Sequence, residues 1–182
     1  ATNTSADFVL RFRRTDGRVH VVLGEWKYTE SYGQSDLAVT AGSGSGDVRL
    51  DTYRAAYCRT GGTFSDHGPD LYRALFFEPL YQLMRLQLLA QEMEQARELG
   101  ADIVSVLHVS PEANREFQAF NPSPHLRERF PGKGALEAWR ALVPADRFVS
   151  LSVESLRAAI GQEARSISPE WVTYLDLRYG WE

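Results

Sequence analysis

The chain has 182 residues, of which 43% are apolar and 24% are charged, and its formal net charge is −4. This length supports one sizeable hydrophobic core, and the acidic balance argues against a protein that coats nucleic acid non-specifically. The single cysteine, Cys58, excludes an internal disulfide framework and a cysteine zinc site. No apolar run approaches the roughly 18–20 residues of a membrane-spanning helix, and no signal peptide pattern appears. We therefore expect a cytoplasmic protein with no membrane partner.

The first elements predicted along the chain are two strands joined by a tight turn. Residues 7–14 alternate apolar and polar side chains, as a half-buried strand does. Residues 18–28 are rich in β-branched side chains, and Asp16-Gly17 between the two runs is a strong hairpin signal. The sequence therefore predicts an opening β-hairpin.

The turn type decides which residues of the hairpin face each other. With a three-residue loop and a left-handed Gly17, residues whose numbers sum to 32 lie opposite, so that Asp7 faces Glu25. A two-residue turn shifts the pairing by one and places Phe8 opposite Glu25, and the apolar pattern fits this alternative as well. A bulge near Asp7 would reconcile the two registers.

Helices and strands alternate in the rest of the chain. Residues 48–58 fit a helix or a strand equally well. The other expected elements are a short helical stretch at 71–77, a long helix at 79–99, a buried strand at 102–109, a helix at 135–143, a short strand at 147–152, and helices at 153–162 and 168–181. This order predicts one α/β domain over 1–182 with a mixed sheet, in which 7–109 form the core and 110–182 a helical and strand extension.

Glu25 and Lys27 stand at the end of the second strand, two residues apart and therefore on one face of it. Burying either charge is costly unless the group is paired or binds a metal. Taken alone, the pair is most simply a surface ion pair at a strand end. A facing Asp7 changes this interpretation, because two opposed carboxylates repel each other unless a cation lies between them.

Magnesium is the cation that suits such a position, because it prefers hard oxygen ligands and commonly binds one or two carboxylates, waters and substrate phosphate. Asp7, Glu25 and the backbone carbonyl of Trp26 are the expected ligands, with Mn²⁺ as a substitute metal. Lys27 would then reach the attacking water or the charge developing on a phosphate. This set suits metal-assisted phosphodiester hydrolysis.

Asp7 followed by an apolar strand and Glu25-Trp26-Lys27 resembles the signature of the PD-(D/E)xK nuclease superfamily, which includes restriction endonucleases and repair exonucleases. The hairpin, the helix at 79–99 and the strand at 102–109 match part of that superfamily's core order. More narrowly, the stretches "EWKYTESY", "YQLMRLQLLAQEME" and "WVTYLDLRYGW" resemble a bacterial family of predicted restriction endonucleases. The resemblance implies a restriction-endonuclease-like fold and a Mg²⁺-dependent endonuclease or exonuclease, of restriction or repair type, that acts on DNA.

The sequence departs from the superfamily pattern before Asp7. Only "ATNTSA" precedes this residue, so the superfamily's first core helix and first strand have no counterpart here, and the usual proline before the aspartate is absent. We therefore keep a second hypothesis, a catalytically inactive module with a nuclease fold that binds nucleic acid or a protein partner. Two-strand cutters commonly use two active sites, which makes a homodimer one expected assembly.

Three further residues are candidates for a supporting role. Gln82 and Arg85 lie three apart near the positive N-terminal end of the long helix, where they would face a substrate or simply solvent. Superfamily exonucleases carry a glutamine on the corresponding helix. Glu30 would approach the metal or orient Lys27, or else lie on the surface. The four histidines lack the spacing of a zinc site.

Overall fold

A mixed sheet of four strands organises the part of the chain that the computed structural model describes, residues 4–27, 35–39, 45–65, 68–114 and 119–179. Its strands lie in the order β1-β2-β3-β4; β1 is antiparallel to β2, and the other neighbours are parallel. The bounds are β1 (Phe8–Arg13), β2 (Val19–Trp26), β3 (Ile103–Ser110) and β4 (Phe148–Ser152). The predicted α/β fold with a mixed central sheet is confirmed.

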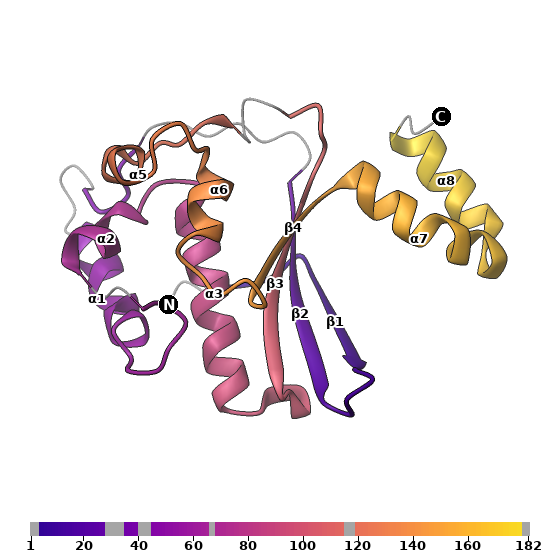
Figure 1. Ribbon diagram of the computed structural model, residues 1–182, viewed down its shortest axis with the longest axis horizontal. Helices are drawn as coiled ribbons and strands as arrows, with labels where there is room; N and C mark the ends of the chain where they lie inside the picture. The colour runs from indigo at the N-terminus through magenta and orange to yellow at the C-terminus, as the bar shows by residue number, and fades with distance from the viewer. Residues whose placement is uncertain (1–3, 28–34, 40–44, 66–67, 115–118, 180–182) are drawn as a thin grey trace.

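The helices cover the two faces of this sheet unequally (Figure 1). One face carries most of them, and the other faces a helical pair that follows β4 (Figure 1). The first group is α1 (Ser45–Tyr57), α2 (Pro69–Ala74), α3 (Leu80–Gln95), α5 (Pro124–Arg129) and α6 (Ala135–Arg140), and the pair is α7 (Val153–Ile167) and α8 (Pro169–Tyr179). The stretch that fitted either a helix or a strand is therefore the helix α1.

The hairpin of β1 and β2 has the three-residue loop. Phe8 pairs with Gly24 and Arg13 with Val19, so the paired numbers sum to 32. Gly17 has a φ of +84°, the left-handed conformation that this loop needs at its last position. The register that brings Asp7 towards Glu25 is thereby confirmed over the two-residue alternative.

Helix α3 ends at Gln95, one turn before the predicted end at residue 99. The reason is backbone conformation, because Arg97 and Leu99 adopt φ values of 51° and 55° and end the α-helical hydrogen bonding. A 3₁₀ turn (Glu98–Gly100) then leads into β3. The predicted helix is correct in type and wrong in its last turn.

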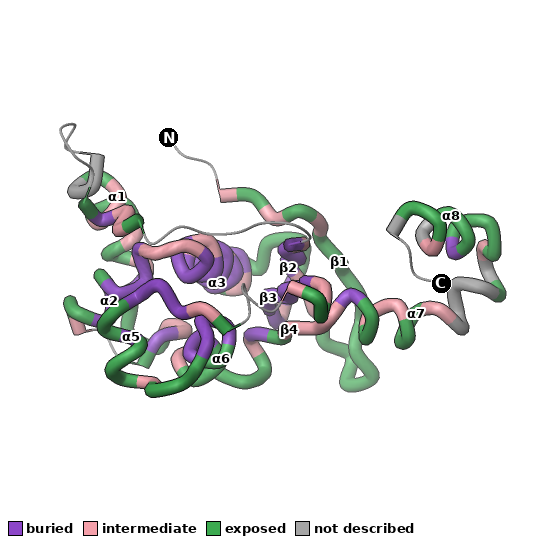
Figure 2. The backbone as a smooth tube through the Cα atoms, turned by 90° about the horizontal axis from the view of Figure 1, so that it is seen from above, coloured by how far each residue is buried: buried purple, intermediate pink, exposed green. Residues whose placement is uncertain are grey.

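The main core lies between the sheet and helices α3 and α6, where the purple segments of Figure 2 gather. Trp139 of α6 is fully buried there, and its ring makes edge contacts with Phe64 and Phe148. Because Phe148 begins β4, the C-terminal extension supplies both a strand and a core helix to the same sheet. A smaller apolar cluster on the opposite face contains Leu107, Val109 and Val153.

Replacing Trp139 by alanine should lower the free energy of unfolding by about 3–5 kcal/mol, because the change leaves a large cavity between α6 and the sheet. Trp171 on α8 is 46% exposed, and Trp171→Ala should change that free energy by less than about 0.5 kcal/mol. Urea titrations followed by circular dichroism measure both values. Equal losses in the two variants would contradict the assignment of Trp139 to the core.

Candidate functional site

Two charged side chains are buried at the carboxyl end of β2. Glu25 and Lys27 are each only 6% exposed, and the Lys27 Nζ lies 2.5 Å from the Glu25 Oε1. Lys27 is fixed to the sheet by its amide, which donates to the Val109 carbonyl of β3 (2.8 Å). The simpler interpretation of Glu25 and Lys27 taken alone, a surface ion pair, is therefore excluded. The pair is buried, where removal of one partner leaves an uncompensated charge.

Asp7 reaches the same place from the start of β1. Its amide donates to the carbonyl of Gly24 (2.9 Å), the residue that also stands opposite Phe8. Two residues facing one is the arrangement of a β-bulge, the feature that the sequence analysis considered near Asp7 as a way to reconcile the two registers. The exposed Asp7 carboxylate accepts a hydrogen bond from the Trp26 amide (2.7 Å), so it is held at the end of β2.

Five of the predicted site residues line one cavity of about 180 Å³. Asp7, Glu25 and Lys27 form its sheet side, and Gln82 and Arg85 approach from the first two turns of α3. Arg85 is oriented by a hydrogen bond from its Nε to the Thr4 hydroxyl (3.2 Å). Thr4, Ser5 and Leu86 complete the lining. Residues that are 81 positions apart in the chain are thus brought together around one polar cavity.

Glu78, which the sequence reasoning missed, stands beside this cavity. Its Oε2 accepts a hydrogen bond from the Gln82 amide (3.4 Å) at the start of α3. Burial raises the pKa of the Glu78 carboxyl above its usual range, against the opposing effects of the Gln82 amide, Lys27 and Arg85. The signal that could have found it is the Glu-Pro pair at the beginning of a helix already assigned to the site.

His108 of β3 is the second residue that the sequence reasoning missed. It pairs in register with Glu25 of β2 on one side and Ser150 of β4 on the other, and it is 1% exposed. Burial, together with the nearby Lys27 and Arg140, lowers the pKa of its imidazole to about 4. The sequence did contain a signal for it: His108 is a polar residue near the carboxyl end of a largely apolar strand, just as Glu25 is in β2.

The carboxylates of Asp7 and Glu25 are the groups of this cavity that could hold a cation. Within the described residues, no group of three or more His, Cys, Asp and Glu side chains is arranged to bind a metal. Two carboxylates beside an open polar cavity fit Mg²⁺, which keeps several waters and takes further oxygens from a phosphate. The part expected of the Trp26 carbonyl stays a prediction.

One predicted supporting residue lies outside the described residues, and the arginines of the hairpin lie outside the cavity. Glu30 falls in the range 28–34, outside the described residues. The arginines of the hairpin do not line the cavity: Arg13 donates to the Gly17 carbonyl (2.7 Å), Arg18 is paired with Asp16 (2.7 Å), and Arg11 donates to the Leu99 carbonyl (2.8 Å). Arg13 and Arg18 stabilise the turn at the opposite end of the hairpin from Asp7, whereas Arg11 connects β1 to the 3₁₀ turn that precedes β3.

Comparison with known proteins identifies the family. The family model described as "REase-ARP: Restriction Endonuclease associating with ARP" matches residues 1–180. The chain belongs to this family. No curated protein and no solved structure matches it.

Membership in this restriction endonuclease family confirms the resemblance predicted from the sequence at that level. It also agrees with the fold, a mixed four-stranded sheet with flanking helices. Among the helices of the described segments, none combines the length and the apolar character that a membrane span requires.

The buried His108 predicts a pH dependence of stability below neutrality. Its pKa is near 6.5 in the unfolded chain and about 4 in the folded protein, so between these values the unfolded state binds more protons and the free energy of unfolding rises with pH. The contribution is complete above pH 6.5 and is lost as the pH falls towards 4. Between pH 7 and pH 5 the loss should be about 2 kcal/mol.

Urea unfolding in the presence of a chelator at these two pH values measures this loss. His108→Gln should remove most of it, whereas His125→Gln, at an exposed position of α5, should leave it unchanged. The same pH dependence in His108→Gln and in the unmodified protein would contradict the assignment.

Proposed function

We propose that this protein is a Mg²⁺-dependent nuclease of the PD-(D/E)xK type that hydrolyses phosphodiester bonds of DNA, with Asp7, Glu25 and Lys27 at its centre. The supporting observation is the single cavity lined by these three side chains together with Gln82 and Arg85. Membership in a restriction endonuclease family supports the same reaction class.

Lys27 supplies positive charge where negative charge develops on the phosphate. Its ammonium lies against Glu25 in a buried setting, and low dielectric strengthens its interaction with a phosphate oxygen. Glu25 therefore has two roles: its carboxylate holds the Lys27 ammonium in position and also lines the cavity. A bound Mg²⁺, retained by Asp7 and Glu25 with Mn²⁺ as its substitute, would polarise the phosphate and lower the pKa of a water.

Arg85 and Gln82 bind the substrate from the α3 side. The Arg85 guanidinium lies over the Tyr81 ring, 5.5 Å from its centre, and donates to Thr4, so its orientation is fixed before a substrate arrives. A guanidinium is well suited to phosphate oxygens. The side-chain amide of Gln82 offers a donor and an acceptor at the same rim.

A specific observation favours the second hypothesis, a module that binds without cleaving. The direct Glu25–Lys27 contact already neutralises both buried charges, so the pair is also explained as a structural element at the end of β2. The family description names an association with ARP, which fits a module that acts beside a partner protein. A homodimer stays a further prediction.

Asp7→Asn tests the nuclease proposal without disturbing the core, because Asp7 is exposed and asparagine keeps an oxygen for the Trp26 amide. We expect Mg²⁺- or Mn²⁺-dependent cleavage of DNA by the unmodified protein, and a loss of at least about 100-fold in Asp7→Asn. The measurement is release of labelled fragments from single-stranded, duplex and branched DNA, with an RNA strand of the same sequence.

Asp51→Asn, at an exposed position of α1, is the matched control for Asp7→Asn and should cleave DNA normally.

Lys27→Met should lose cleavage activity by a factor similar to that of Asp7→Asn. Lys133→Met, which changes the other lysine of the chain, should keep normal activity. A double variant, Glu25→Gln with Lys27→Met, removes both buried charges and separates loss of folding from loss of chemistry. Absence of cleavage of every substrate with either metal would leave the binding module as the function.

A further inference from the structure

The polar floor of the Glu25 cavity continues across the sheet. Glu25, His108 and Ser150 pair in register on β2, β3 and β4, and Ser110 pairs with Ser152 one step of the same face further on. Nearer the middle of the sheet, the corresponding positions belong to the apolar core, as Val106 and Phe148 do. On this face of the sheet, polar side chains therefore replace apolar ones near the carboxyl ends of the parallel strands.

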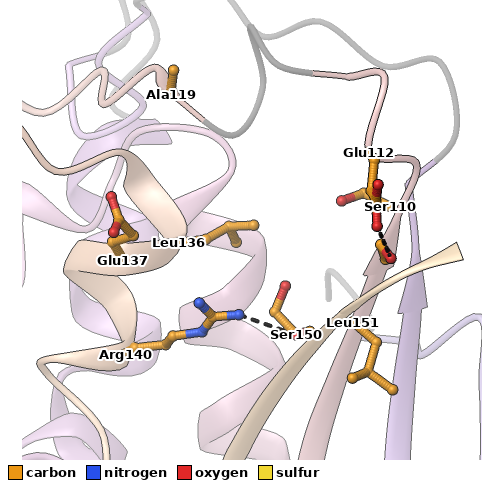
Figure 3. Close-up of a pocket in the computed structure, with 9 residues that line it drawn as sticks. Ser110, Glu112, Ala119, Leu136, Glu137, Arg140, Ser150 and Leu151 are labelled. Atoms are coloured by element: carbon orange, nitrogen blue, oxygen red, sulfur yellow. Dashed lines mark hydrogen bonds between the residues drawn. The ribbon is translucent and has the colours of Figure 1, made fainter. Parts of the chain in front are cut away.

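A second cavity, of about 410 Å³, lies over the β4 end of this polar floor. Figure 3 shows its two walls: α6 on one side, and the ends of β3 and β4 on the other. The lining consists of Ser110, Glu112, Ala119, Leu136, Glu137, Arg140, Ser150, Leu151 and Ser152. Its volume falls in the range of cavities that take small organic groups.

The lining combines hydrogen-bonding groups of both kinds with an apolar surface. The Arg140 guanidinium donates to the Ser150 carbonyl (3.1 Å) and is thereby held across the cavity (Figure 3). The Ser152 hydroxyl donates to the Glu112 carboxylate (2.8 Å). Two carboxylates, Glu112 and Glu137, disfavour a phosphate in this cavity, whereas donors, acceptors and the Leu136 side chain together suit a nucleobase.

The two cavities lie on the same face and at the same end of the sheet. Glu25 and Ser150 are two strands apart, or about 10 Å from the spacing of neighbouring strands, which one or two nucleotides of an extended strand can span. His108 stands between them, where its imidazole is influenced by Lys27 from one cavity and Arg140 from the other.

We infer that the α6 cavity binds the base of an unpaired nucleotide close to the phosphate that is cleaved, with Arg140 as the main donor to that base. This inference rests on the proposed nuclease function and names its substrate class, a single-stranded or locally unpaired nucleic acid. A base inside a duplex is stacked and paired, so it can enter such a cavity only after it has been extruded, which costs free energy.

Binding in the presence of a chelator tests the cavity separately from cleavage. The probes are a fluorescent single-stranded DNA, a single-stranded RNA and a DNA duplex of the same sequence, each followed by anisotropy. We expect a single strand to bind more tightly than the duplex, and Arg140→Gln to weaken that binding about tenfold. The DNA and RNA arms show which sugar the protein accepts.

Two further variants sharpen this experiment. Ala119→Trp fills the cavity from an exposed position and should weaken single-strand binding without affecting folding. Arg129→Gln removes an equal charge from an exposed position of α5 and should bind normally. Binding of the duplex as tight as that of the single strand, normal binding by Arg140→Gln and Ala119→Trp, or an equal loss in Arg129→Gln would each overturn the inference.

Cleavage assays with the same variants distinguish the two proposals. Metal-dependent cleavage that prefers duplex DNA and is unchanged in Arg140→Gln would overturn the cavity assignment and keep the nuclease. Single-strand binding that is lost in Arg140→Gln, without cleavage by any variant, would overturn the nuclease and keep the cavity as a nucleotide-binding site.

Discussion

The buried ion pair between Glu25 and Lys27 is the constraint on which the carboxyl end of β2 depends. Both side chains are almost fully buried, so each depends on the other to offset the free energy lost when a charge leaves water. A hydrophobic pair of similar size would stabilise this position at least as well. Stability alone therefore does not require a charged pair at this position, and a role in binding charged ligands is a second physical reason for it.

The hairpin turn determines whether Asp7 can join this pair. A left-handed Gly17 sets the register in which paired numbers sum to 32, and the bulge at Asp7 then turns its carboxylate towards the amide of Trp26. A shift of one residue would move every side chain of β1 to the other face. A glycine at one end of the hairpin thus controls the position of a carboxylate at the other end.

Local signals made these features predictable from the sequence. The Asp-Gly turn, the alternation of β1 and the two charges after an apolar run are all contained within short segments. The hairpin and the placement of Asp7, Glu25 and Lys27 near its open end could therefore be predicted. The register could only be narrowed to two alternatives, because the turn type depends on the backbone conformation of Gly17. His108 and Glu78 could not be derived in this way, because their significance depends on long-range pairing. His108 becomes a neighbour of Glu25 only when β3 pairs with β2 in a particular register, and no local sequence pattern determines that register.

The end of α3 could not be predicted either, because Arg97 and Leu99 have no intrinsic preference for a positive φ.

The parallel pairing of β2, β3 and β4 explains why both cavities open at one edge. Parallel strands bring their carboxyl ends together, and in open α/β sheets ligands bind outside those ends. Here α3 closes one side of that edge with Gln82 and Arg85, and α6 closes the other with Arg140. Because the two helices approach different strands, the space at this edge is divided into two cavities, and His108 of β3 lies between Glu25 of one and Ser150 of the other. A nucleic-acid strand lying across this edge would meet cationic groups at β2, which suit its phosphate. At β4 it would meet a mixed polar and apolar cavity, which suits its base. The two cavities thus match the two parts of a nucleotide.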